Sequence, residues 1–221
     1  MTNGIAVADL ARVNARLEGA SALDVLRWTF DTFDDDVVVA CSFEDVVLAH
    51  LVHCLRPEIP VTFLDTGGHF AETLEFVARV ERDWGLRVER LTPPPAADAW
   101  PCGTAECCQW RKVVPLAAAL AGRAAWVSAI KRVDAPTRAA TPVVGWDEKF
   151  QLVKVSPLAA WNDDDVAAYL AMHELPIHPL WSEGYTSIGC AATSQRPLEG
   201  EGRRSGRWTG TGKLECGLHE G

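Results

Sequence analysis

Apolar residues follow two alternating periods along the chain, which predicts strands and helices in turn. Short β-branched or apolar runs that end in polar residues predict strands at 36–42, 60–65, 86–91, 124–130 and 150–158. Longer segments with apolar residues three and four positions apart predict helices at 44–55, 71–84 and 106–121. Another helix is expected to start at Asn162, because Asn162 followed by Asp165 is typical of a helix N-cap.

This order of elements predicts an α/β fold with a mostly parallel sheet and helices on both faces. In such sheets, ligands bind beyond the carboxyl ends of the strands, so residues 42–45, 65–69 and 131–138 should form the rim of a site. From Gly184 onward the apolar periodicity disappears, and glycine and arginine become frequent. We therefore expect one α/β domain over 1–184 and an arginine-rich, flexible C-terminal segment over 185–221.

Length and charge exclude several classes of protein. A chain of 221 residues suits one domain, and a formal net charge of −9 argues against a nucleic-acid or anionic-membrane surface. No apolar run approaches the roughly 18 residues that a membrane span needs. The first twenty residues carry charges at helical spacing, unlike a signal peptide, so the cytoplasm is the expected compartment.

The cysteines favour metal binding or redox chemistry over disulfides, because seven is an odd number and Cys107 and Cys108 are adjacent. Neighbouring thiols point in different directions, and soft thiolates favour zinc or iron–sulfur centres. Cys190, far downstream after GYTSIG, is a third candidate ligand. Cys41 and Cys54 lie inside apolar elements, where a cysteine is usually an ordinary packing residue.

Basic residues gather in three places of an otherwise acidic chain: directly after the cysteine pair, in IKRVDAPTR, and between Arg196 and Lys213. Arginine forks bind phosphate and sulfate oxygens in pairs, so these groups predict an oxyanion ligand. The chain has no G-x-x-x-x-G-K-[ST] sequence, which excludes a Walker-type NTPase.

A seventh thiol, Cys216, stands in the polar stretch KLECGLHEG, where it has no apolar periodicity around it. Either it is an incidental surface thiol, or it is a mobile nucleophile.

Six ordered motifs decide between these interpretations: LDTGGHFAET, CCQWRKVVPL, IKRVDAPTR, GYTSIGC, RSGRW and KLECGLH. Through them the chain resembles the assimilatory adenylyl-sulfate (APS) and phosphoadenylyl-sulfate (PAPS) reductases from about residue 36 to the end. The resemblance implies a PP-loop-like fold of the adenine nucleotide alpha hydrolase kind, related to the Rossmann fold, with the nucleotide bound in the domain over 1–184. It also implies that the Cys216 thiolate attacks the sulfate sulfur, AMP leaves, and thioredoxin reduces the S-sulfocysteine to release sulfite for cysteine biosynthesis.

The resemblance also assigns roles to individual residues. The substrate-binding positions that it implies are Ser42, Asp65, Lys112, Arg138, Arg204 and Arg207. In the members of the family that carry a [4Fe–4S] cluster, a fourth cysteine joins the positions of Cys107, Cys108 and Cys190, but here that position is Thr193. Cys102 could supply the missing sulfur if its loop folds back.

Three alternatives to an APS reductase stay open at this point. A PAPS reductase would release sulfite and adenosine 3′,5′-bisphosphate, although the three retained cysteines favour APS. A non-catalytic iron–sulfur or zinc regulator would bind metal without turnover. An ATP-using PP-loop relative is disfavoured, because the loop at 42–45 lacks the expected glycine. His219 could tune the thiol of Cys216 or dock the C-terminal segment.

Overall fold

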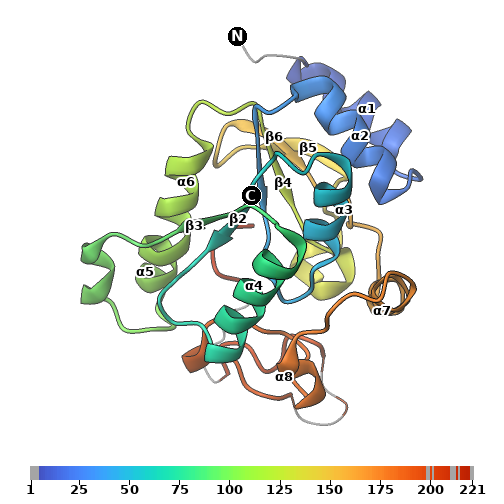
Figure 1. Ribbon diagram of the computed structural model, residues 1–221. Coiled ribbons are helices and arrows are strands. Elements are labelled where there is room, and N and C mark those ends of the chain that lie inside the picture. Colours follow the sequence, from blue (N-terminus) through green and yellow to red (C-terminus); the bar gives the residue numbers. More distant parts are fainter. Residues whose placement is uncertain (1–4, 198–199, 201, 210–212, 214, 220–221) are drawn as a thin grey trace.

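A twisted sheet lies at the centre of the computed structural model, which describes residues 5–197, 200, 202–209, 213 and 215–219 (Figure 1). Within these residues the sheet has six strands in the order β3-β2-β1-β4-β6-β5. The strands are β1 (Val37–Ala40), β2 (Val61–Leu64), β3 (Val88–Leu91), β4 (Ala125–Ser128), β5 (Val144–Asp147) and β6 (Leu152–Val155). All neighbours pair in parallel except β5, which runs antiparallel to β6. The predicted mostly parallel α/β sheet is confirmed.

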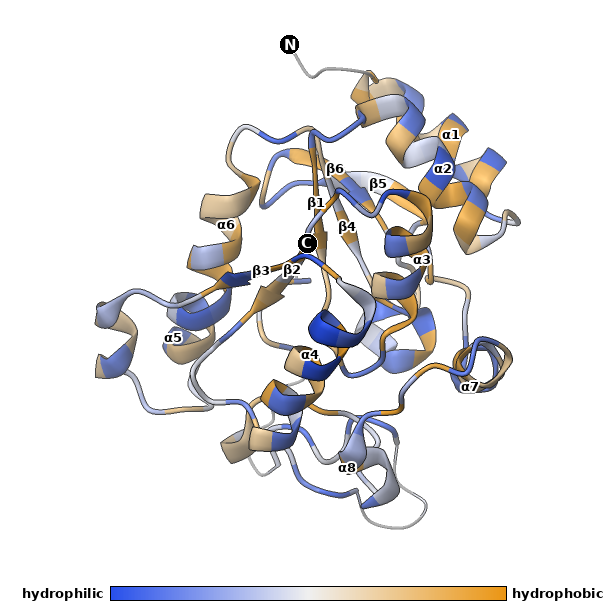
Figure 2. Cartoon of the chain, viewed as in Figure 1, coloured by the Kyte–Doolittle hydropathy of each residue, from blue (hydrophilic) through white to orange (hydrophobic). Residues whose placement is uncertain are grey.

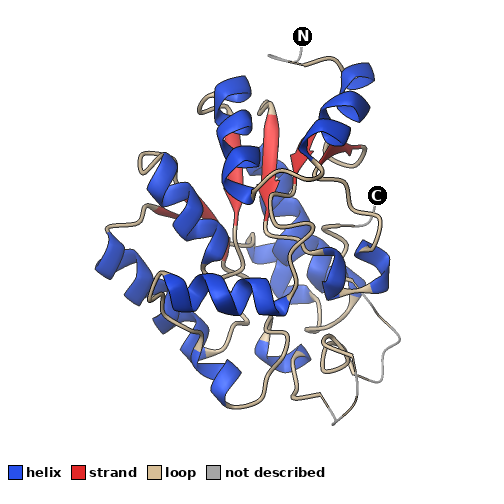
Figure 3. Ribbon diagram, turned by 90° about the vertical axis from the view of Figure 1, so that its right-hand side faces the viewer, coloured by secondary structure: helices blue, strands red, loops and turns tan. Residues whose placement is uncertain are grey.

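Side chains of the central strands alternate between two apolar clusters, one on each face of the sheet. Val37 and Val39 of β1 pack into the larger cluster, whereas Val38 between them packs into the smaller one. The larger cluster holds the apolar faces of α1 (Leu10–Leu17), α2 (Ala22–Phe33), α3 (Val47–Leu55), α4 (Ala71–Trp84) and α7 (Asp163–Met172). The smaller one holds α6 (Val114–Leu120) and Leu218. Helices therefore flank the strands on both sides (Figure 3).

Burial explains the composition of the strands. The central strands β1, β2 and β4 are almost wholly enclosed, and their residues are mostly apolar. At the sheet edge, β3 is only half-buried and reads VERL, which Figure 2 shows as more hydrophilic than neighbouring β2. The hydropathy of a strand thus reflects its place in the sheet.

A widened turn divides the helical run that carries the cysteine pair. α5 (Ala105–Cys108) continues through the π-helical turn η3 (Gln109–Val113) into α6. Pro115 is the cause that the sequence offers, because proline has no N–H to donate and its ring clashes with the carbonyl four residues earlier. The helix predicted at 106–121 exists, but with one turn wound more loosely.

Several of the described elements were not predicted, including α1, α2, α8 (Pro179–Ser182) and β5. β5 has four residues with Gly145 among them, so it lacks the β-branched run that marks the other strands. α2 starts at Ser21, whose hydroxyl accepts a hydrogen bond from the N–H of Asp24, an N-cap that the sequence contains. The remaining helices are the short segment α8 and α7, whose predicted N-cap at Asn162 is confirmed.

The last described residues return to the sheet. Leu218 is buried against Val38, Leu116 and Trp126, on the face covered by α6. Among the described residues, no helix is both long and apolar enough to cross a membrane. The division at residue 184 stays a prediction.

Candidate active site

A cavity opens at the ends of the neighbouring strands β1 and β4. The strands that follow β1 extend the sheet to one side, and those that follow β4 extend it to the other side. Residues following β1 and β4 line the cavity, together with residues 187–189 and the C-terminal segment. This is the switch point at which open α/β sheets bind ligands. The cavity gathers all but one of the residues expected to bind substrate or act as nucleophile: Ser42, Lys112, Arg138, Arg204, Arg207 and Cys216.

Glu215 fixes the chain beside the nucleophile candidate Cys216. Its buried carboxylate accepts hydrogen bonds from Nε and Nη2 of Arg138, at 2.7 and 2.9 Å. Thr137 and Arg204 donate to the same carboxylate at 3.2 and 3.3 Å. Burial raises the pKa of Glu215, but the Arg138 hydrogen bonds and the Arg204 and Arg138 charges lower it more, so the net shift is downward. The carboxylate is therefore ionised at neutral pH and anchors the segment.

His219 docks the last described residues on the sheet. Its ring stacks on Trp126, with centroids 5.4 Å apart and planes 9° from parallel. The Lys154 ammonium lies 3.3 Å from His219 Nδ1 and can only donate, so this nitrogen accepts the hydrogen bond. Burial, followed by the charges of Lys154 and Arg138, holds the pKa of His219 well below its usual value. The imidazole is neutral, and its contacts favour the docking role over tuning of the thiol.

Several buried donors along the cavity lack a protein acceptor. Among the described residues, the buried atoms without a hydrogen-bond partner include Arg204 Nε, Arg207 Nε, Trp126 Nε1 and Ser128 Oγ. All four side chains line the cavity. Unsatisfied buried donors are costly in a folded protein, so their convergence indicates a ligand rich in acceptor oxygens.

Lys112 connects the cavity to the cysteine group. Burial lowers the pKa of Lys112, but the negative potential of the Cys216, Cys190 and Cys108 sulfurs raises it more, so the ammonium stays charged. Lys112 also lines both the large cavity and the small one that the cysteines surround. One cation thus faces both places.

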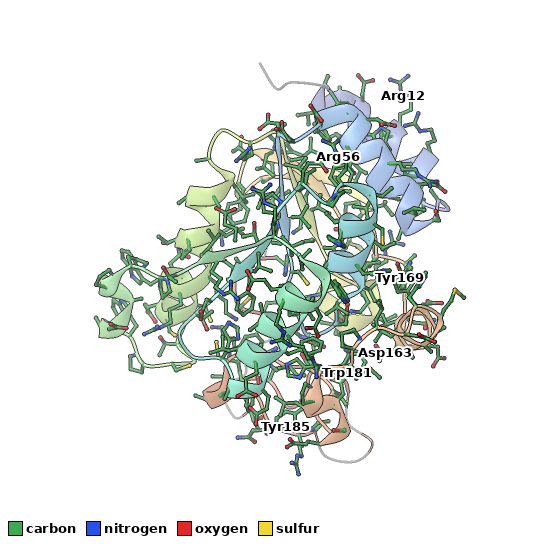
Figure 4. All side chains as sticks on the ribbon, viewed as in Figure 1. Arg12, Arg56, Asp163, Tyr169, Trp181 and Tyr185 are labelled. Carbon is green, nitrogen blue, oxygen red and sulfur yellow. The ribbon has the colours of Figure 1, made fainter. Side chains whose placement is uncertain are left out.

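Acidic residues beneath the basic ones were missed by the sequence analysis. Asp45 pairs with Lys131 at 3.3 Å, and Glu44 accepts from Arg203 at 2.6 Å. Arg203 also pairs with Asp163, the first residue of α7, which is labelled in Figure 4. The sequence signal that could have identified them was the acidic pair directly after β1, which lies at the predicted rim of the site. These carboxylates hold the cations in place and offset much of their charge.

Asp65 is the one expected substrate-binding residue outside the cavity lining. Its carboxylate accepts the N–H of Gly67 at 3.1 Å and so shapes the loop after β2. That loop holds the segment of Cys190: Gly68 O accepts from Ala191 N at 2.7 Å, and Thr66 Oγ1 lies 3.4 Å from Cys190 Sγ. The LDTGG motif therefore supports the cysteine group.

Cys107, Cys108 and Cys190 come together as expected, around a small cavity that Cys102 and Thr193 also line. The first three are buried, and Cys102 is the exposed one. Lys213 Nζ lies 3.0 Å from Cys108 Sγ. Desolvation raises the pKa of Cys190, but Lys112, the Thr66 hydrogen bond and two arginines lower it more. Cationic and hydroxyl neighbours of this kind suit thiolate ligands.

The sulfurs are not arranged for one metal ion. Within the described residues, no three His, Cys, Asp or Glu side chains lie close enough to bind the same ion. An iron–sulfur cluster makes a different demand, since each cysteine binds its own iron and the sulfurs stand farther apart. The cysteine group thus offers soft sulfur donors around one small cavity, without the arrangement that a single ion needs.

Comparison with known families identifies the class of protein to which the chain belongs. Residues 36–196 match the phosphoadenosine phosphosulfate reductase domain family, and the chain belongs to this family. It is 46% identical to the adenosine 5′-phosphosulfate reductase of Mycobacterium tuberculosis, over 95% of this chain and 92% of that protein. The protein of the same name from Mycobacteroides abscessus is 45% identical, over 93% and 90%.

Solved structures confirm the fold. The phosphoadenylyl-sulfate reductase from Candida auris superposes with a TM-score of 0.77 at 22% identity, over 88% of this chain and all of that one. The FMN adenylyltransferase of Candida glabrata gives 0.60 at 17% identity, over 86% and 75%. The PP-loop-like α/β fold is thus shared with enzymes that handle adenine nucleotides.

Proposed function

We propose that this protein reduces adenylyl sulfate to sulfite and AMP in assimilatory sulfate reduction. The observation that carries the proposal is the placement of the Cys216 thiol in a strand-end cavity beside guanidinium groups with unpaired donors. The extent of similarity to the mycobacterial adenosine 5′-phosphosulfate reductases supports this substrate.

In the first half-reaction, the Cys216 thiolate attacks the sulfur of the sulfate group. A bond forms between Sγ and that sulfur, while the bond from sulfur to the bridging oxygen breaks and its electron pair leaves with AMP. The enzyme then carries an S-sulfocysteine. Arg204, Arg207 and Lys112 stabilise the charge that grows on the leaving phosphate, because they line the cavity and two of them keep an unpaired buried donor.

Arg138 has a positioning role in this proposal beside the substrate-binding role that the motif implied. Its fork is taken up by Glu215 and, at 3.0 Å, by Asp134. We therefore assign Arg138 to positioning Cys216 as well as to the charge of the cavity. Ser42 lies at the end of β1, where its hydroxyl can meet the nucleotide, and Asp65 acts through the loop after β2.

In the second half-reaction, a dithiol protein such as thioredoxin supplies two electrons. One thiolate attacks Sγ of Cys216 and releases sulfite, and the second thiol resolves the mixed disulfide. Cys216 is partly exposed, which supports this access. We propose that the chain around Cys216 undocks from the cavity for this step, while Cys190 stays with the cysteine group.

The cysteine group would hold an iron–sulfur cluster through Cys107, Cys108 and Cys190. Such a cluster would add a charged group next to Lys112, whose ammonium faces both cavities. All seven cysteines are free thiols, which fits the reducing cytoplasm that we propose as the compartment.

The test is sulfite release from anaerobically prepared protein with thioredoxin, comparing adenylyl sulfate with phosphoadenylyl sulfate at equal concentrations. We expect preference for adenylyl sulfate, no sulfite from Cys216→Ser, and full activity from the control Cys54→Ser. Sulfite from Cys216→Ser would contradict the mechanism, and preference for the phosphorylated nucleotide would support the alternative, a PAPS reductase. Absence of sulfite with either nucleotide would favour a non-catalytic iron–sulfur protein.

A further inference from the structure

The contacts of the Thr193 side chain are those of a packing residue and not those of a metal ligand. Its hydroxyl donates to the carbonyl of Cys190 at 3.3 Å, within the short turn Ala191–Thr193. Its methyl group faces the neighbouring loop, because a Cβ added to Gly103 would lie 3.1 Å from Thr193 Cγ2. A hydroxyl is also a poor ligand for iron beside thiolates. The position where relatives of the cluster type carry a cysteine is therefore occupied by a packing residue.

The loop that touches Thr193 brings a fourth sulfur to the group. Cys102 lines the same small cavity as Cys107, Cys108, Cys190 and Thr193. Four thiols from three chain segments thus surround one space.

Local geometry explains how the loop folds back. Gly103 has φ +98°, a conformation that favours glycine, and it reverses the chain between Cys102 and the helix. Thr104 then caps that helix: its hydroxyl accepts the N–H of Cys107 at 3.1 Å. Lys213 binds the carbonyl of Thr104 and the sulfur of Cys108, at 3.1 and 3.0 Å, and ties the loop to the C-terminal segment. The loop is thus held at the cysteine group from both ends.

We infer that Cys102 is the fourth protein ligand of the iron–sulfur cluster, in place of the cysteine that Thr193 replaces. This inference rests on the cluster in the proposed function. It restores a four-thiolate set, the usual one for a [4Fe–4S] centre, with a ligand from a different segment. The exposure of Cys102 and the burial of the other three give the site one open side.

The experiment measures iron and acid-labile sulfide per chain, with electron paramagnetic resonance, on anaerobically purified full-length protein. We expect about four irons in the original protein. Cys102→Ser should lose about a quarter of the iron or more and show a paramagnetic three-iron form. The double variant Cys102→Ser with Thr193→Cys should regain the full iron content, because it moves the ligand to the position used by relatives. Cys54→Ser, at an exposed cysteine outside the group, is the control.

Either of two results in the variants would overturn the inference: unchanged iron and spectra in Cys102→Ser, or no recovery in the double variant. Recovery also excludes misfolding as the cause of the loss. Sulfite release is measured on the same preparations. Iron-free original protein that still releases sulfite would contradict the ligand assignment and leave the proposed reaction intact. Iron-loaded protein that releases no sulfite would contradict the proposed reaction and leave the ligand assignment intact.

Discussion

Arg138 holds the carboxylate of Glu215 through two of its nitrogens, at 2.7 and 2.9 Å, although the two residues are 77 positions apart. Both side chains are buried. Because Cys216 follows Glu215 directly, this pair sets the position of the nucleophile.

Replacement of Glu215 by Gln should release the chain on either side of Cys216. Removing one partner of a buried ion pair costs about 3–5 kcal/mol, because the other charge is left uncompensated. We expect faster hydrogen exchange in the peptide spanning 213–221 and a loss of sulfite release of about a hundredfold or more. The exposed Glu174→Gln is the matched control. Unchanged exchange in Glu215→Gln would show that the ion pair does not hold the segment.

Docking should also depend on pH through Glu215. Its pKa in the folded protein lies below the ordinary value of 4.5, so its stabilising contribution is present above that value. The contribution is lost as the pH falls through the lowered pKa. Hydrogen exchange of the segment should therefore accelerate in this acid range in the original protein, whereas Glu215→Gln should lack that transition.

His219 should act by docking its ring on the sheet and not by exchanging a proton with the Cys216 thiol. Aromatic pairs contribute about 0.5–1.5 kcal/mol beyond burial, so His219→Ala should lower kcat/KM about two- to tenfold, whereas His219→Phe keeps the stack on Trp126. The pKa of the imidazole is lowered, so docking is fully present above the ordinary value of 6.5 and weakens as the pH falls below it. The Phe variant should lose this pH dependence. If Phe is as damaging as Ala, the nitrogen atoms matter instead.

Activity should depend on the planar guanidinium of Arg207 and on its position. Its Nη1 donates to Ser187 Oγ at 3.2 Å, and its guanidinium lies 4.6 Å from the ring centre of Trp208. Lysine reproduces the charge but not the planar fork, so Arg207→Lys should lower kcat/KM about ten- to a hundredfold. Arg196→Lys, an exposed arginine of the same region paired with Glu183, should change little. Equal activity of the two variants would remove Arg207 from the site.

Substrate binding should also require a glycine at position 189, because a larger residue would displace the guanidinium of Arg207. A Cβ at this position would overlap the guanidinium of Arg207, whereas a Cβ at Gly19 meets no atom within 4 Å. Gly189→Ala should therefore raise the KM for the nucleotide at least about tenfold by moving Arg207, while Gly19→Ala keeps the original value. A normal KM in Gly189→Ala would mean that the cavity accommodates the shift.

The strands and the cavity rim were readable from the sequence because both follow local patterns. The β-branched run of β1 predicts a buried strand, and polar residues after it, such as Ser42, predict a ligand site. Motif resemblance located Lys112 and Cys216. The partners of these residues were not readable, since the contact of Glu215 with Arg138 and the stack of His219 on Trp126 join distant segments. β5 escaped prediction because its place as an edge strand depends on β6.

The π-helical turn Gln109–Val113 makes the number of residues in this helical run matter more than their identity. It adds one residue to a helical run, and each residue turns an α-helix by about 100°. Loss of a single codon there would restore ordinary α-helical winding and rotate Cys107 and Cys108 away from Cys190, while α6 would stay packed on the sheet.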